Sequence, residues 1–219
     1  AWGAVRSIPD RETIVDVYIE GKIINSDGEK LTLEISVSDI SNELWYSKTY
    51  TQSVGYYAYK NNMEIYRDPF QNLFNSIAND LAEYRHELPS VNAKNISTIS
   101  ELRFARDFSP EAFSEHISQS SSGELKITSL PAENDPILNK ISDIRKRDHL
   151  FIDTMQGHYD GFSRRMEKPY QSWREATHEE ISSARELKRQ SITRTVGGIA
   201  AVIGGIMASG SSNGSAQSA

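Results

Sequence analysis

Alternating apolar and polar positions over residues 12–54 predict a three-stranded antiparallel meander. Apolar residues occupy every second position of two segments: Val15, Val17 and Ile19 in the first, and Leu31, Leu33, Ile35 and Val37 in the second. A period of two residues is typical of strands with one buried face. We therefore expect these residues to form the buried face of the sheet.

Two short polar turns divide this region into strands. Ser26-Asp27-Gly28 is expected to be a tight turn, in which Gly28 adopts a positive φ and Asp27 bonds to nearby backbone. A second turn at Ser41-Asn42 leads to a third predicted strand over residues 44–54, which is rich in aromatic and threonine residues.

A helix is predicted to follow the meander and to cover its apolar face. Asp68-Pro69 is a start signal, with Asp as the N-cap and Pro in the first turn. Apolar residues then recur at helical spacing: Phe70, Leu73, Phe74, Ile77, Ala78 and Leu81. Pro89 lies just beyond the end of this pattern. We expect residues 1–89 to form a small α/β domain.

Residues 90–135 have a mixed pattern and are expected to connect two parts of the chain. A short helix is predicted within Ile99–Arg106, and Ser109-Pro110 repeats the pattern of a cap followed by proline. Residues 124–130 are a possible additional strand. The segment is therefore interpreted as a connector with short helices.

A long helical pattern begins at Asp135-Pro136 and occupies residues 136–194. Its apolar residues are mostly three or four positions apart: Ile137, Ile141, Ile144, Phe151, Met155, Tyr159, Phe162, Met166, Tyr170 and Trp173. This spacing favours a helical hairpin or a coiled coil. Pro169 lacks a backbone donor and clashes with the preceding turn, so we expect a break or kink near residues 168–169.

Small residues recur every four positions in the apolar helical segment 195–208. We call them the glycine stripe: Gly197, Ala200, Ala201, Gly204, Gly205 and Ala208. Such positions let two helices approach closely, especially in lipid. The uninterrupted apolar run, residues 196–208, has 13 residues, whereas a single membrane span needs about 20. Insertion into one leaflet, a shortened span within an oligomer, a soluble helical assembly and packing within the chain's own fold all remain open.

Composition narrows the possible partners. Of the 219 residues, 37% are hydrophobic and 25% are charged, and the formal net charge is −6. Residues 137–194 carry 12 Lys or Arg against 9 Asp or Glu, and the rest of the chain carries 12 against 21. The acidic N-terminal part argues against nucleic acid as a partner.

The lack of cysteine excludes disulfides, thiol catalysis and thiolate metal sites. Residues 209–219 are expected to be a flexible Gly/Ser tail.

Candidate chemistry is limited to binding. Aromatic residues suited to an interface with a partner, or equally to half-buried strand ends, gather around the third strand: Trp45, Tyr46, Tyr56, Tyr57 and Tyr59. His149 and His158 are not three or four residues apart, as a helical zinc site prefers, so no metal site is expected. The sequence lacks a phosphate-binding loop and the other common catalytic motifs. We therefore expect no cofactor, no catalytic residue and no enzymatic activity.

The order of the N-terminal elements suggests a family resemblance. It is carried by residues 17–24 (VYIEGKII), 31–39, 44–50 (LWYSKTY) and the helix over 69–84. This order resembles the small α/β domain of bacterial envelope proteins, as in the N-terminal domain of TolB and the curli secretion lipoprotein CsgG. The resemblance covers residues 12–86 and implies a periplasmic role in envelope assembly, with no catalytic residues.

Together these patterns predict an α+β protein with a long C-terminal helical region. The leading hypothesis is a non-enzymatic structural or assembly protein of the bacterial cell envelope. It would face the periplasm, associate with the outer membrane, and form a homo-oligomer or join a larger envelope complex. The glycine stripe would contact membrane or neighbouring copies. The alternatives are a pore-forming or membrane-perturbing protein, and a soluble ligand-binding or enzymatic domain whose C-terminal helix packs internally.

Overall fold

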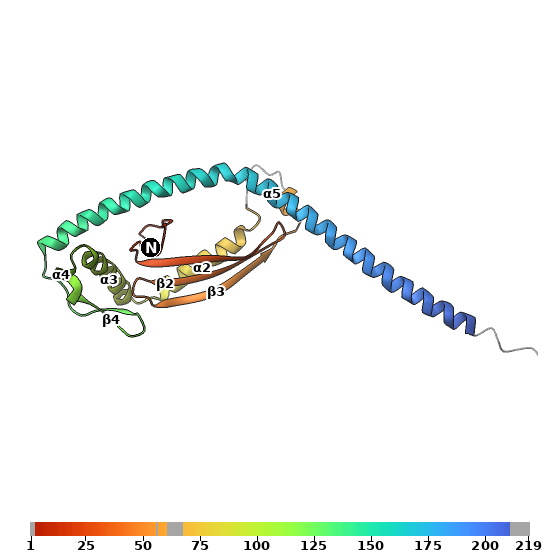
Figure 1. Ribbon diagram of the computed structural model, residues 1–219, viewed down its shortest axis with the longest axis horizontal. Helices are drawn as coiled ribbons and strands as arrows, with labels where there is room; N and C mark the ends of the chain where they lie inside the picture. Colours follow the sequence, from red (N-terminus) through yellow and green to blue (C-terminus); the bar gives the residue numbers. More distant parts are fainter. Residues whose placement is uncertain (1–2, 56, 61–67, 211–219) are drawn as a thin grey trace, which may run out of the picture.

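The computed structural model describes residues 3–55, 57–60 and 68–210, except for the side chains of residues 57, 60 and 193–210. The protein is α+β, as predicted (Figure 1). We call residues 3–127 the head. The elements are β1 (Val17–Ser26), β2 (Lys30–Asp39), β3 (Leu44–Ser53), α1 (Tyr57–Lys60), α2 (Gln71–Glu87), α3 (Ser90–Phe108), α4 (Pro110–Phe113), η1 (Ser114–His116), β4 (Ile117–Gln119), β5 (Leu125–Ile127) and α5 (Pro136–Gly210).

The predicted meander is present as an antiparallel sheet in the order β1-β2-β3. In the β1–β2 turn, Asp27 Oδ1 accepts hydrogen bonds from the backbone N–H groups of Glu29 and Lys30, at 2.8 and 2.6 Å. The expectation of a positive φ at Gly28 is wrong, because Gly123 is the one glycine with a positive φ among the described residues. Gly28 is required for a different reason, its packing against α5.

The buried face was predicted largely correctly for β2 and only in part for β1. Leu31, Ile35 and Val37 are buried, as expected, and Leu33, Val15 and Val17 are partly buried against the core. On β1, however, Tyr18 is 4% exposed and Ile19 is 47% exposed. Helix α2 packs on β3 and leaves the β1 side of the same face uncovered. Tyr18 is buried on the opposite face, where its hydroxyl donates to the Thr13 carbonyl at 3.0 Å.

The start of α2 also differs in detail from the sequence expectation. Phe70, rather than Asp68, is the N-cap residue. Asp68 Oδ1 instead accepts a hydrogen bond from the Phe70 N–H at 2.7 Å. The buried stripe of α2 is narrower than predicted, since Leu73 and Ile77 are buried whereas Phe74 and Ala78 are exposed.

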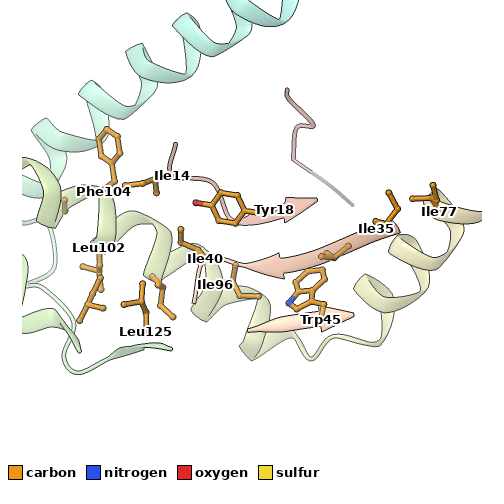
Figure 2. Close-up of a cluster of buried hydrophobic side chains, with 14 of the residues drawn as sticks. Ile14, Tyr18, Ile35, Ile40, Trp45, Ile77, Ile96, Leu102, Phe104 and Leu125 are labelled. Atoms are coloured by element: carbon orange, nitrogen blue, oxygen red, sulfur yellow. The ribbon is translucent and has the colours of Figure 1, made fainter. Parts of the chain in front are cut away.

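The region after α2 belongs to the same hydrophobic core as the sheet. In place of the short helix predicted within Ile99–Arg106, α3 runs for 19 residues from Ser90. The possible strand is present as β5, which pairs with β4 and is joined to the β2–β3 turn by a Leu125 N–H to Ser41 carbonyl bond of 2.9 Å. Figure 2 shows buried side chains of the sheet, α2, α3 and β5 gathered in this core.

Helix α5 is one continuous helix and not the hairpin that the spacing favours. Asp135 Oδ1 caps its start by accepting the N–H groups of Ile137 and Leu138, at 2.7 and 3.0 Å. The helix continues through Pro169 without a break, and its axis changes direction near the middle of its length (Figure 1). Within the described residues, no helix is long and apolar enough to cross a membrane.

Candidate functional site

The turn between β1 and β2 packs directly against the backbone of α5. A β-carbon built on Gly28 would overlap the Arg174 carbonyl oxygen and would lie 2.5 Å from the His178 backbone nitrogen. Only a residue without a side chain fits there, which explains the glycine in physical terms. We call Gly28, Tyr59, Asp68, Arg174 and His178 the junction, because together they fix α5 to the head.

Arg174 is the charged centre of the junction. Its side chain is 3% exposed, and Nη1 lies 2.8 Å from Asp68 Oδ2. Its guanidinium also lies over the rings of Tyr170 and Phe70, at 4.3 and 4.9 Å from their centroids. Arginine suits this place because it pairs with a carboxylate and stacks on aromatic faces at once. Farther along α5, Arg185 forms an ion pair with Glu29 of the same turn.

Tyr59, predicted to bind a partner, belongs to this internal junction. Its hydroxyl donates a hydrogen bond to the Gly28 carbonyl, and its ring centroid lies 5.3 Å from that of His178. Burial raises the pKa of Tyr59 to about 12, with Arg174 lowering it and Asp68 raising it as smaller influences. This aromatic side chain therefore holds α5 in place within the chain.

Trp45 and Tyr46 also make contacts inside the head, as expected for the alternative in which these aromatic residues pack at a strand end. Trp45 is 7% exposed, stacks on Tyr84 at 4.9 Å and donates from Nε1 to Asp39 Oδ2 at 3.0 Å. The ring of Tyr46 lies 5.9 Å from that of Tyr84. Through these contacts with Tyr84, the aromatic side chains of β3 pack against α2.

Two further sequence predictions fall beyond what the structure describes. Tyr56 lies outside the described residues, and the side chain of Tyr57 is outside the description. The side chains of the glycine stripe, Gly197, Ala200, Ala201, Gly204, Gly205 and Ala208, are likewise outside it. The backbone of residues 195–208 is helical as part of α5 and lies far from the head in Figure 1.

The first third of α5 is tied to the head by a second set of contacts. Arg145 donates to Ser100 Oγ at 2.5 Å and lies 3.7 Å from Asp16 Oδ1. Arg6 of the N-terminal segment forms an ion pair with Asp153, about two turns beyond Arg145 on α5, at 2.5 Å. Burial, followed by the charges of Arg145 and Arg6, lowers the pKa of His149. No group of His, Asp or Glu side chains in the described part of the chain could hold a metal ion.

From the end of its first attachment to the junction, α5 carries apolar side chains that are exposed, apart from the half-buried Met155. We call Phe151, Met155, Tyr159, Phe162, Met166, Tyr170 and Trp173 the α5 seam. Phe162 is 56% exposed and Trp173 is 47% exposed. The buried residues Ile152, Arg174 and His178 mark the side of α5 that faces the head, and helical spacing places the seam about a quarter of a turn away.

A groove of about 1230 Å³ runs beside β1. Its walls are formed by the start of β1, the exposed side of α2, the start of α3, the N-terminal segment and the first third of α5. Sequence reasoning missed this groove, because it arises where α2 fails to cover β1. Its walls include the exposed Ile19 and the small residues Ala78 and Ala82. These are the residues that identify the groove in the sequence once the fold is known.

Comparison with protein-family models, curated proteins and solved structures finds no match for this chain.

Proposed function

We propose that this protein is a non-enzymatic assembly protein of the bacterial cell envelope, in which α5 presents the glycine stripe at a distance from the head. One observation carries the proposal. Helix α5 is held to the head at Gly28 and Arg174 and then continues as a single helix to Gly210. The small-residue segment thus stands at the end of a helical arm, where another copy or a membrane can reach it.

The position of the glycine stripe supports its association with another copy or with a membrane, and not packing of the C-terminal helix against its own head. The backbone of residues 195–208 lies away from the head (Figure 1), so the head does not offer its own surface to the glycine stripe. Small residues at four-residue spacing allow close contact between helices in a partner or in lipid. The α5 seam adds a second apolar surface on the same helix. The proposed setting, facing the periplasm at the outer membrane, rests on the resemblance of residues 12–86 to envelope proteins.

The mass of the purified chain in mild detergent tests this proposal. We expect a large assembly for the full chain and a monomer after removal of residues 195–219. Gly197→Leu combined with Gly205→Leu should have the same effect, because leucine side chains on the stripe hold two helices apart. A monomer in all three proteins, each at the mass its own sequence gives, without membrane partitioning, would overturn the proposal.

A matched variant separates the stripe from general apolar character. Ile199→Leu combined with Ile206→Leu places leucines on the opposite side of an ideal helix and should leave the assembly intact. Near-ultraviolet circular dichroism, to which the buried Trp45 contributes, reports whether the head stays folded in each variant. Dye leakage from liposomes distinguishes the alternative function: binding without leakage favours assembly, and leakage favours a pore-forming protein.

A further inference from the structure

The groove beside β1 follows the edge of a sheet. Six consecutive residues, Val15 to Glu20, line it. Successive side chains of a strand point to opposite faces, so a groove lined by consecutive residues runs along the edge of the strand. β1 is the outermost strand of the sheet and pairs with β2 alone among the described residues. Its outer N–H and C=O groups are therefore available to another strand.

The floor of the groove is apolar and made partly of small residues. On the α2 side it is lined by Ala78, Leu81, Ala82 and Leu88, and on the strand side by Val17 and Ile19. A strand placed beside β1 would direct every second side chain onto this floor, because α2 leaves that part of the sheet face open. The volume of about 1230 Å³ exceeds the about 300–1,000 Å³ that is usual for small-molecule pockets, and it suits a peptide segment.

The charges of the groove favour an acidic ligand. Its carboxylates already have partners: Glu20 pairs with Arg11 at 2.6 Å, and Asp16 lies 3.7 Å from Arg145. Asp10 accepts hydrogen bonds from the backbone of its own turn, at Glu12 and Thr13.

Arg85 is the exception among these charges. It lies half-buried in the last turn of α2 and makes no ion pair with another described residue. An arginine beside apolar side chains is a preferred site for a carboxylate.

We propose that this groove binds an extended acidic peptide segment of a partner protein, which adds to β1 as a fourth strand. Backbone hydrogen bonds to β1 supply affinity, apolar side chains contact Ala78 and Ala82, and a carboxylate pairs with Arg85. This is recognition by strand addition, in which pockets for alternate side chains supply specificity. The proposal does not depend on the glycine stripe, and it holds for a head that remains monomeric.

The experiment measures binding of a fluorescein-labelled probe peptide to the full chain. The probe has about nine residues, within the length range of ordinary strands, with alternating valine and threonine, blocked ends and a central aspartate as its one charged side chain. A second probe carries asparagine in place of the aspartate. We expect the aspartate probe to bind about tenfold more tightly, as one charge-assisted hydrogen bond implies.

Three variants test the individual walls of the groove. Arg85→Gln should remove the preference for aspartate over asparagine. Ala82→Trp should abolish binding of both probes by filling the groove from an exposed position. Arg103→Gln is the matched control, because Arg103 is also a half-buried arginine, lies on the neighbouring α3 and does not line the groove. This variant should bind like the unmodified chain.

Hydrogen exchange distinguishes strand addition from adhesion to the surface. Bound probe should slow exchange of backbone amides in residues 17–20, since a fourth strand pairs with that edge. The proposal is overturned by the absence of binding up to about 1 mM, the weak end of specific affinity. It is also overturned by binding that ignores both Arg85→Gln and Ala82→Trp, or by binding without protection of β1.

Discussion

Gly28 lies against the α5 backbone at Arg174 so closely that no side chain fits between them. The two residues are far apart in sequence, and their contact fixes the direction in which α5 leaves the head. The same turn contributes Glu29, which pairs with Arg185 about three turns farther along the same face of the helix. The β1–β2 turn is therefore the last part of the head that holds α5 before the helix continues to the glycine stripe.

Gly28→Ala should loosen α5 from the head. A β-carbon would overlap the Arg174 carbonyl, and overpacking of this kind costs about 1–3 kcal/mol. We expect a lower free energy of unfolding in urea and faster amide exchange near His178. Gly157→Ala is the matched substitution on α5. Gly157 has open space around it, so alanine should stabilise the helix by about 0.5–1 kcal/mol. Equal effects of the two substitutions would contradict the contact.

Arg174→Gln should destabilise the junction more than loss of an exposed charge does. The change removes the bond to Asp68 and the stacking on Phe70 and Tyr170. Loss of a hydrogen bond to a charged group costs about 1.5–3 kcal/mol. Lys146→Gln removes the exposed ion pair with Asp143 on the same helix and should cost less than about 1 kcal/mol. Urea denaturation of both variants makes the comparison, and similar losses would argue against a buried role for Arg174.

Raising the pH through the alkaline range should weaken the junction. The pKa of Tyr59 is about 12 in the folded protein, against an ordinary value of about 10. Between these values the unfolded state has lost the phenolic proton and the folded state retains it, so stability falls as the pH rises. Tyr59→Phe should remove part of this slope. Identical slopes for the free energy of unfolding in the two proteins, between about pH 10 and 12, would contradict the assignment.

The local sequence predicts which residues of the head form strands and helices, but it does not predict which of their side chains other elements cover. The alternating period predicted three strands, and helical spacing predicted α2 and the start of α5, because these patterns reflect backbone geometry. The periodicity of β1 could not reveal that Tyr18 is buried and Ile19 is exposed. That outcome depends on α2 packing over β3, which is a tertiary contact.

The candidate sites were harder to predict for the same reason. Aromatic residues in and after the third strand suggested a binding surface, yet Trp45 packs in the core and Tyr59 in the junction. Gly28 suggested a turn conformation, although its role is contact with a helix distant in sequence. The groove could not be predicted from local pattern, because it is the space that α2 leaves open beside β1, and Ile19, Ala78 and Ala82 can be recognised as its wall residues only once the fold is known.

Asp39→Asn should destabilise the head through Trp45. Asp39 is 1% exposed, and its carboxylate accepts hydrogen bonds from the Ser41 N–H at 2.8 Å and from Trp45 Nε1 at 3.0 Å. An amide group there turns a donor toward one of these donors, and a buried group without a partner costs about 1–3 kcal/mol. The expected result is a lower melting temperature. A stability equal to that of the unmodified chain would show that the carboxylate is dispensable.

Charged substitutions in the α5 seam should weaken self-association without unfolding the head. Phe162 and Trp173 are about half exposed, so Phe162→Glu with Trp173→Glu removes little buried area, whereas it places charge on the apolar surface that would meet another copy. Leu150→Glu is the control. Leu150 is 65% exposed and lies off the seam by helical spacing. Sedimentation should show a smaller assembly for the double variant alone, with an unchanged melting temperature in both. An unchanged assembly in the double variant would leave the glycine stripe as the surface responsible for association, because the seam would then be exposed without joining copies.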